Sequence, residues 1–524
     1  MSAVTDASTS VSKSVTTASA TRLKSYLLYT LSACLYILPF MRLYMQGTDE
    51  GILDNGAVRV IHGQVFARDF FEVIGPGTFY WLAAFFKLFG VSFLATRICL
   101  FITSLGTALL MYFLSRRICT RYWILPCLIL AGTYFSGLWP AISHHVDSNF
   151  FALLAVALIV LWHEKRRPAL LVAAGTCAAL TTAFLQPKGM LLFCAFLIWL
   201  WVLHRRGNSS LSTLGLVTGG YLSVVGLVLL YFWSNGALGS LLYVNVVWPN
   251  QHYWGVNVVP YAYNFISNFW NHFVIVKSGY RWTFVTGIIL IIPVALIAAL
   301  PGLLPVLGAR YKWGVATPEV LLYWLCGGAM WIAELHRKDM THLIFGSPLL
   351  IILCVYFLSQ YRGAIARSTL QLLSVSAACL ASFNLLLTLL AAHPIATRVG
   401  LIHAFREIPG LQYLEAHTSP GEEIFAYPYC PRYYFLSDTA NPTPYNILTY
   451  NYHTPSQFQE VVRILEQHKV QYVVWDTNLD KIMPPVFPGS TRLPPGGLVV
   501  EPYLESHYKD VLVVDGVRIM EREK

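Results

Sequence analysis

The segment 49–77 reads DEGILDNGAVRVIHGQVFARDFFEVIGPG and directly follows the first apolar segment of the chain. It is amphipathic and too polar to cross a membrane. A carboxylate at the water interface stays ionised and can act as a base, because it escapes the cost of the bilayer centre. Asp49 and Glu50 are therefore candidate catalytic residues of a lipid-facing active site. The spacing is equally consistent with an acidic pair that only ends a helix and solvates a loop.

Composition identifies an integral membrane protein. The 524 residues are 56% hydrophobic and only 12% charged, whereas soluble proteins carry about 25% charged residues. Residues 1–22 are Ser/Thr-rich without an apolar core, which predicts a flexible cytoplasmic tail and no cleavable signal peptide. The net charge of +10 does not indicate nucleic-acid binding, because Arg and Lys lie mostly in short loops between apolar runs.

Apolar runs near or above about 17 residues predict a mainly α-helical, polytopic protein with about eleven transmembrane helices. The predicted spans are 23–43, 92–114, 122–141, 146–163, 168–185, 188–204, 211–233, 282–306, 318–335, 342–359 and 369–392. The run 75–90 is apolar but short and carries Lys87. It is either a twelfth span or a helix lying in the membrane interface.

The positions of the basic residues decide between these two topologies. With eleven spans and a cytoplasmic N-terminus, the basic clusters all fall on one side, as the positive-inside rule expects. These clusters are Arg22/Lys24, Arg116/Arg117/Arg121, Lys165/Arg166/Arg167, Arg205/Arg206, Arg310/Lys312 and Arg362/Arg367. With twelve spans the first cluster would oppose the others. We therefore expect interfacial helices in the first outer loop and an extracytoplasmic active site in a cell inner membrane.

The composition changes to charged and Pro-rich after residue 392. The segments 422–428 and 470–476 are typical of buried strands, and 456–469 between them has the pattern of an amphipathic helix. The segment 431–446 is expected to be rich in turns. The chain is thus expected to divide into a transmembrane domain, 23–392, and a small extracytoplasmic α/β domain, 393–524.

The loop SHHVDS, 143–148, carries a hydroxyl, two imidazoles and a carboxylate. Neighbours along a tight loop cannot easily form a catalytic triad. A divalent-metal site of His144, His145 and Asp147 is one alternative. The others are that Asp147 caps the next helix or orients groups facing the same cavity as Asp49. No cofactor is certain from this pattern, and the ten cysteines show no disulfide framework or zinc spacing.

Basic residues at the outer ends of spans are candidate phosphate ligands. Lys188 follows Gln-Pro and could pair with a phosphate at headgroup depth, although a snorkelling lysine is the alternative. In HRKDMTH, 336–342, Arg337 and Lys338 offer further phosphate contacts, with His336 and His342 as a polar wall. This loop breaks the positive-inside pattern, so a local anionic partner would explain it.

The outer loop WPNQHYWG, 248–255, contributes Trp248, His252, Tyr253 and Trp254. It is either an ordinary interfacial aromatic belt or a loop that stacks on a sugar or covers an acceptor. No Asp, Glu, Lys or Arg lies near the middle of a predicted span, which argues against an ion-coupled transporter. The absence of phosphate-loop and dinucleotide motifs argues against nucleotide ligands.

Together these motifs resemble the integral-membrane glycosyltransferases of the C superfamily. The similarity is greatest to the bacterial branch related to protein O-mannosyltransferases and the lipid A aminoarabinose transferase. The matching residues are Asp49, Glu50, Pro76, Leu88, Phe89, Gly90, Arg97, Asp147 and Lys188. GPG at 75–77 replaces the His-Pro-Pro of mannosyltransferases, which leaves the donor sugar open.

The resemblance implies a polyprenyl-phosphate monosaccharide as donor and Asp49 as the base that activates an acceptor hydroxyl for inverting attack. Lys188 and Arg337 would then stabilise the leaving phosphate. The acceptor would be a glycan, a lipid or a protein. Two other functions stay open from the sequence: a transporter or flippase of lipid-linked glycans, and a non-catalytic membrane scaffold.

Overall fold

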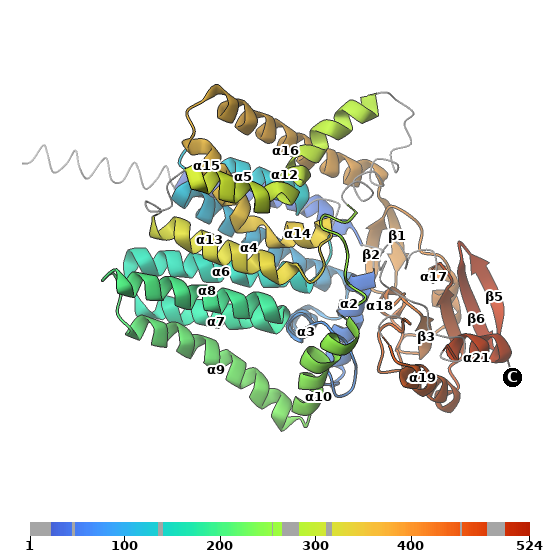
Figure 1. Cartoon of the computed structure of the whole chain (residues 1–524). Coiled ribbons are helices and arrows are strands. Elements are labelled where there is room, and N and C mark those ends of the chain that lie inside the picture. The colour runs from blue at the N-terminus through green and yellow to red at the C-terminus, as the bar shows by residue number, and fades with distance from the viewer. Residues whose placement is uncertain are drawn as a thin grey trace, which may run out of the picture.

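The computed structural model describes residues 23–44, 48–134, 140–253, 255–264, 282–310, 317–450, 453–478 and 498–523. A bundle of long helices forms one part of the molecule, and a small mixed sheet with short helices lies at one end of the bundle (Figure 1).

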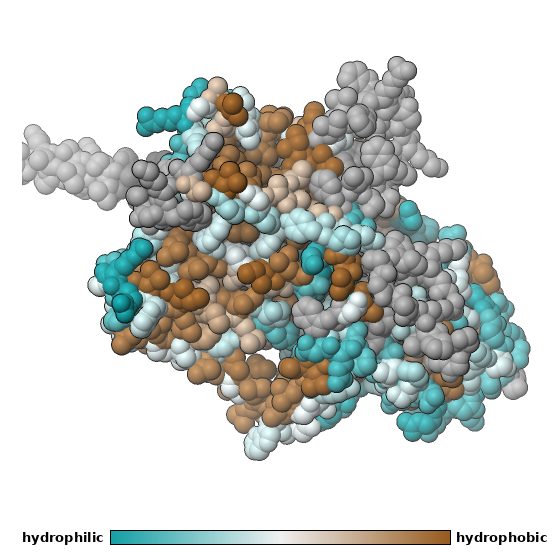
Figure 2. Space-filling view, viewed as in Figure 1, coloured by the Kyte–Doolittle hydropathy of each residue, from teal (hydrophilic) through white to brown (hydrophobic). Residues whose placement is uncertain are grey.

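The bundle has the length and surface of a membrane domain. Among the described residues, seven helices are long and apolar enough to cross a membrane. They are Leu23–Arg42, which ends in the 3-10 helix η1 (Leu38–Arg42), α4 (Phe93–Ile118), α6 (His144–Lys165), α8 (Gln186–Arg205), α9 (Ser212–Ser234), the segment Ile289–Ala309 of α12 (Trp282–Arg310), and α16 (Ala364–Ala391). Apolar residues cover the flank of the bundle, as lipid contact requires (Figure 2). The predicted multi-pass, mainly helical architecture is confirmed.

The remaining predicted spans are shorter or broken helices. α14 (Met340–Gly346) and α15 (Pro348–Gln360) meet at a bend of 71° and would together make an eighth span. The predicted spans 122–141, 168–185 and 318–335 correspond to α5 (Ile124–Thr133), α7 (Pro168–Phe184) and α13 (Pro318–Glu334). Each of these three has fewer than 18 residues, so the total of eleven stays a prediction.

Small residues set the closest packing in the bundle. A Cβ added to Gly175 of α7 would lie 2.1 Å from the Val217 carbonyl oxygen of α9, and one added to Gly220 would lie 2.1 Å from that of Val172. Helices in lipid gain little from hydrophobic exclusion, so they associate where small residues let their backbones approach.

The basic helix ends gather at the end of the bundle away from the sheet. Arg117, at the end of α4, pairs with Glu164 near the end of α6. Arg166 donates to the Asn208 carbonyl oxygen just beyond α8 at 2.9 Å. Three of the predicted basic clusters are thus neighbours in space, which the positive-inside argument requires.

At the opposite end, two helices of the first outer loop lie between the bundle and the sheet (Figure 1). They are α2 (Thr48–Ile61) and α3 (Gly77–Phe89), which pack against each other. α3 has 13 residues and is therefore about 20 Å long, too short for a hydrocarbon core of about 30 Å. The prediction that 75–90 does not form a span agrees with this length. The outer loop after α9 forms α10 (Leu238–Leu242) and the π-helical turns η2 (Tyr243–Val247) and η3 (Pro249–Tyr253).

The C-terminal region is a mixed α/β unit. The hairpin β1 (His393–Thr397) and β2 (Gly400–Ala404) leads into a four-stranded sheet of order β3-β4-β6-β5. Its strands are β3 (Ile424–Tyr427), β4 (Tyr472–Asp476), β5 (Tyr508–Val514) and β6 (Val517–Arg522), and its helices are α17 (Leu411–His417), α18 (Arg432–Leu436), α19 (Pro455–His468) and α21 (Val500–His507).

The central unit of this sheet follows the sequence pattern. β3 and β4 are parallel, with Ile424 opposite Tyr472, and α19 connects them. Both predicted strands and the helix between them are confirmed. The segment 431–446, predicted to be rich in turns, begins with a short helix. The aromatic residues of Arg432–Leu436 form α18, whose side chains from Tyr433 to Leu436 are buried.

α18 packs tightly on α2, so the C-terminal unit is joined to the first outer loop. A Cβ added to Gly51 of α2 would lie 2.6 Å from the Arg432 backbone nitrogen. Arg59 donates to the Thr443 carbonyl oxygen at 2.5 Å, and Asn55 donates to Asn446 at 2.8 Å. The apolar core of the bundle continues into α18 without a break.

Gly51→Ala is therefore expected to destabilise the protein by about 1–3 kcal/mol, the usual cost of overpacking a filled contact. The new methyl group meets backbone atoms, which cannot rotate away. The measurement is thermal unfolding of the detergent-solubilised protein. Gly215→Ala in α9 is the matched control, because nothing lies within 4 Å of its added Cβ. Equal melting temperatures for the two variants would contradict this prediction.

Candidate active site

Asp49 lies in the first turn of α2 and is half-buried. Burial raises the pKa of its carboxyl group, while the nearby side chains of His145, His342 and Arg337 act to lower that pKa. α6, α14 and the α13–α14 loop thus place basic groups from three segments around the Asp49 carboxylate on α2. This is the environment of a base that is shielded from water but remains ionisable.

Glu72, in the same outer loop, is a second acidic group close to Asp49. It is buried, and burial raises the pKa of its carboxyl group to about 8. The charge of Asp49 also raises this pKa. Glu72 is therefore largely protonated at neutral pH and can donate a hydrogen bond. It is not among the site residues predicted from the sequence.

Glu50 faces away from Asp49, because successive helix residues are about 100° apart. Its carboxylate pairs with Arg97 of α4 at 2.5 Å, and both side chains are buried. Arg97 also donates to the Pro140 carbonyl oxygen at 3.1 Å and stacks over Phe93. Glu50 is thus engaged in an ion pair that fixes α2 against α4.

Lys188 is fully buried at the start of α8 and does not snorkel. Its ammonium group contacts Glu334 at 2.5 Å, Asn149 at 2.8 Å and Ser148 at 3.1 Å. An ammonium group has three N–H donors, so these three acceptors use all of them. The geometry favours a structural ion pair over direct contact with a phosphate.

Glu334, the last residue of α13, is the main site residue that sequence reasoning missed. It is completely buried and contacts both Lys188 and His145. One signal was available: an isolated acidic residue at the outer end of the apolar run 318–335, directly before HRKDMTH.

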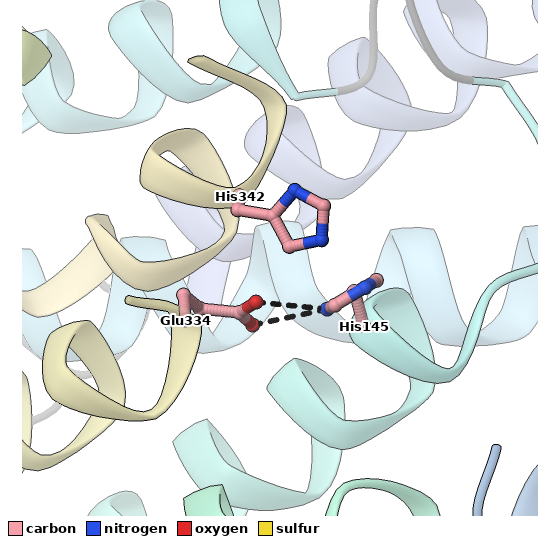
Figure 3. A group of neighbouring side chains, drawn as sticks. All are labelled: His145, Glu334 and His342. Atoms are coloured by element: carbon pink, nitrogen blue, oxygen red, sulfur yellow. Dashed lines mark hydrogen bonds and ion pairs between the residues drawn. The ribbon is translucent and has the colours of Figure 1, made fainter. Parts of the chain in front are cut away.

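Two histidines from separate elements meet beside Glu334 (Figure 3). His145 Nδ1 lies 2.9 Å from one Glu334 carboxylate oxygen and 3.1 Å from the other. His342 Nδ1 lies 2.7 Å from Asp339, and the two imidazole centroids are 4.8 Å apart. His144 and His336 flank this pair, with ring centroids 3.9 Å from His145 and 5.0 Å from His342, respectively.

The metal set predicted from 143–148 is not assembled. Asp147 lies beside Thr78 of α3 and is not part of the group of possible metal ligands among the described residues. Asp147 also does not cap α6, because Ser143 is the N-cap and accepts from the His145 backbone N–H at 3.2 Å. The described residues instead bring together His145, Glu334 and His342, whose ligand atoms lie within 4.8 Å of one another.

Arg337 and Lys338 differ in how they are held. Arg337 is buried and donates to Asp339 at 2.5 Å and to Asn257 at 3.1 Å. Lys338 is half-buried, and its ammonium group has no partner among the described residues. Arg337 thus holds a fixed guanidinium group beside Asp49. The neighbouring Lys338 has an ammonium group that no partner fixes within the described residues.

The aromatic loop contributes unequally to the site. Trp248 is buried against Phe71 and His252, with ring centroids 5.1 and 5.2 Å away, so it is a packing residue. Burial raises the pKa of Tyr253 and that of Tyr429 in the C-terminal unit, and the nearby charge of Asp49 raises both further. These two tyrosines form part of the site wall. Trp254 lies outside the described residues.

Comparison with solved structures identifies the fold. The chain matches ArnT from Cupriavidus metallidurans bound to undecaprenyl phosphate with a TM-score of 0.60, covering 95% of this chain and 98% of ArnT at 11% identity. The chain has the ArnT fold. The apo state of ArnT matches with a TM-score of 0.51 at 12% identity, covering 96% of this chain and 98% of ArnT.

The fold expected from the resemblance is thus confirmed. No protein-family model matches the sequence, and no curated protein sequence matches it.

Proposed function

We propose that the chain is a glycosyltransferase that moves a monosaccharide from a polyprenyl-phosphate donor to an acceptor hydroxyl on the extracytoplasmic face of the membrane. The observation that carries the proposal is the position of Asp49, a half-buried carboxylate beside Arg337 and His342. The shared fold supports it, because ArnT in that fold binds undecaprenyl phosphate.

In the proposed reaction, Asp49 accepts the proton of the acceptor hydroxyl as the hydroxyl oxygen attacks the anomeric carbon. The bond between that carbon and the phosphate oxygen breaks, and its electron pair leaves with the polyprenyl phosphate. Arg337 and Lys338 stabilise the growing negative charge on the phosphate. Attack opposite the leaving group inverts the anomeric configuration.

The other predicted residues receive supporting roles in this proposal. Glu50 is a positioning residue that fixes the orientation of Asp49 through Arg97. Lys188 acts through Glu334 and His145, because its three donors are already used. Tyr253 and Tyr429 border the space for sugar or acceptor, while Trp248 and His252 pack against each other in the same outer loop.

The direct test uses purified protein in nanodiscs with a polyprenyl-phosphate-linked sugar and a membrane-derived acceptor fraction. The proposal expects release of polyprenyl phosphate and glycosylation of the acceptor. A flippase would move the labelled donor across a proteoliposome membrane without cleaving it, and a scaffold would do neither. Intact donor after incubation with an acceptor fraction from the native membrane would refute the transferase.

The proposed orientation predicts which exposed positions are accessible from outside the cell. A cysteine at Ser506, in the C-terminal unit, should react with a membrane-impermeant thiol reagent on intact cells. A cysteine at Asn208, in the basic loop after α8, should react only after permeabilisation. Both positions are exposed, so burial does not explain a difference. The reverse labelling pattern would show that the protein has the opposite orientation in the membrane.

The raised pKa of Asp49 predicts the acidic limb of the pH–rate profile. The base works only when deprotonated, so activity is lost as the pH falls through this pKa. Burial raises the pKa, so the loss should begin above the ordinary aspartate value of about 3.9. The measurement is kcat/KM against pH. The Glu72→Gln variant removes the other nearby carboxyl group that titrates. If the acidic limb of the profile vanished in this variant, Glu72 rather than Asp49 would be its cause.

A further inference from the structure

We propose that His145, Glu334 and His342 bind a divalent transition-metal cation, with zinc as the expected ion. The three side chains come from α6, α13 and α14, and their ligand atoms lie within 4.8 Å of one another. They point toward a common space (Figure 3). Metal binding by these residues does not depend on the proposed function. Contact between the metal and the donor phosphate does rest on the proposed function.

His342 is oriented as metal-ligating histidines commonly are. Its Nδ1 lies beside the carboxylate of Asp339, which is not one of the three proposed ligands. Such a carboxylate fixes the tautomer and makes the imidazole a better metal ligand. The Nε2 atoms of His342 and His145 have no hydrogen-bond partner among the described residues, so His342 can bind through its Nε2 while Asp339 holds its ring.

Glu334 can serve both the lysine and a metal. Lys188 contacts one carboxylate oxygen, while the other is contacted only by His145 within the part of the chain that the structure describes. A rotation of the His145 ring would bring its free nitrogen to the metal and leave that oxygen as a monodentate ligand. His145 and Glu334 are buried and His342 is half-buried, so little water competes for the ligand atoms.

The chemistry of the ligand set selects the ion. Two imidazole nitrogens and one carboxylate oxygen suit zinc and neighbouring transition metals, whereas magnesium and calcium prefer oxygen ligands throughout. Zinc–ligand bonds of about 2.0–2.1 Å would draw the ligand atoms to about 3.4 Å from one another. Small side-chain rotations supply this contraction.

Three protein ligands leave a fourth position of a tetrahedral ion open. The local charges of Glu334 and Lys188 cancel, as do those of Asp339 and Arg337. The two positive charges of the metal would therefore be balanced by Asp49 and by an anion in the open position. A phosphate oxygen of the donor fits this position, so phosphate should tighten metal binding.

The test uses the purified full-length protein, stripped with a chelator and titrated with zinc chloride by calorimetry. We expect about one equivalent to bind, and cobalt(II) chloride to give the visible absorption of a tetrahedral site. His342→Ala and His145→Gln should each lower the zinc affinity at least about 10-fold. Loss of a residue that only hydrogen-bonds to a metal ligand usually costs that much, and loss of a ligand should cost no less. Inorganic phosphate should raise the wild-type affinity.

His204→Ala is the matched control, because His204 lies in the last turn of α8 while Lys188 lies in the first. Its zinc affinity should equal that of the wild type. Thermal unfolding without metal separates a lost ligand from a misfolded variant. Wild-type zinc affinity in folded His342→Ala and His145→Gln, or no zinc binding by the folded wild type, would overturn the proposal.

The same measurements separate this inference from the proposed function. Full sugar transfer by protein without bound metal would leave the transferase standing and remove the role of the metal toward the donor phosphate. Stoichiometric zinc binding that depends on His342, without any transfer, would support the metal site and count against the transferase.

Discussion

Asp49→Asn is expected to lower turnover by about 10²–10⁴, the usual contribution of a general base. The amide keeps the shape of the carboxylate but cannot accept the proton of the acceptor hydroxyl. Folding should be unaffected, since Asp49 is only half-buried and the variant removes a partly desolvated charge. The measurement is single-turnover transfer from a polyprenyl-phosphate sugar in nanodiscs, with donor binding determined separately.

Asp69→Asn is the control for this prediction. Asp69 belongs to the same outer loop, but it is paired with the neighbouring Arg68 at 2.8 Å. Its removal should leave transfer within a few-fold of the wild type. If Asp49→Asn and Asp69→Asn had similar turnover, Asp49 would not be the base.

The parts of the architecture predicted correctly are those that local sequence patterns determine. The long apolar runs, the short helix after Pro76 and the β3–α19–β4 unit all follow from hydrophobic period and length. The grouping of basic helix ends follows from charge alone. The exact number of spans could not be obtained in this way. α5 and α7 are apolar but short, α13 has only 17 residues, and α14 and α15 are sharply bent relative to each other.

Several of the predicted site residues lie near one another in the structure, but their pairings were not predicted. Asp49, Arg337 and His342 are in the same region, as expected. Glu334 was missed because its contact with His145 joins residues 189 positions apart, and no local period reports such a contact. Lys188 was predicted at the membrane interface. It is instead completely buried, because its ammonium group pairs with the Glu334 carboxylate.

The Lys188–Glu334 pair carries the second large expected effect. Lys188→Met should destabilise the protein by about 3–5 kcal/mol, because it leaves the buried Glu334 carboxylate without its ammonium partner. Glu334→Gln should be destabilising for the reciprocal reason. The measurement is the free energy of unfolding in denaturant and mixed micelles, at a pH where Glu334 is ionised in the unfolded chain.

The double variant Lys188→Met with Glu334→Gln separates a structural pair from a phosphate ligand. If the two side chains mainly neutralise each other, the double variant should recover most of the stability, since no unpaired charge remains buried. If Lys188 instead binds the donor phosphate, Lys188→Met would weaken donor affinity with little loss of stability, and Glu334→Gln would not rescue it. The fully used donors of the lysine lead us to expect the first result.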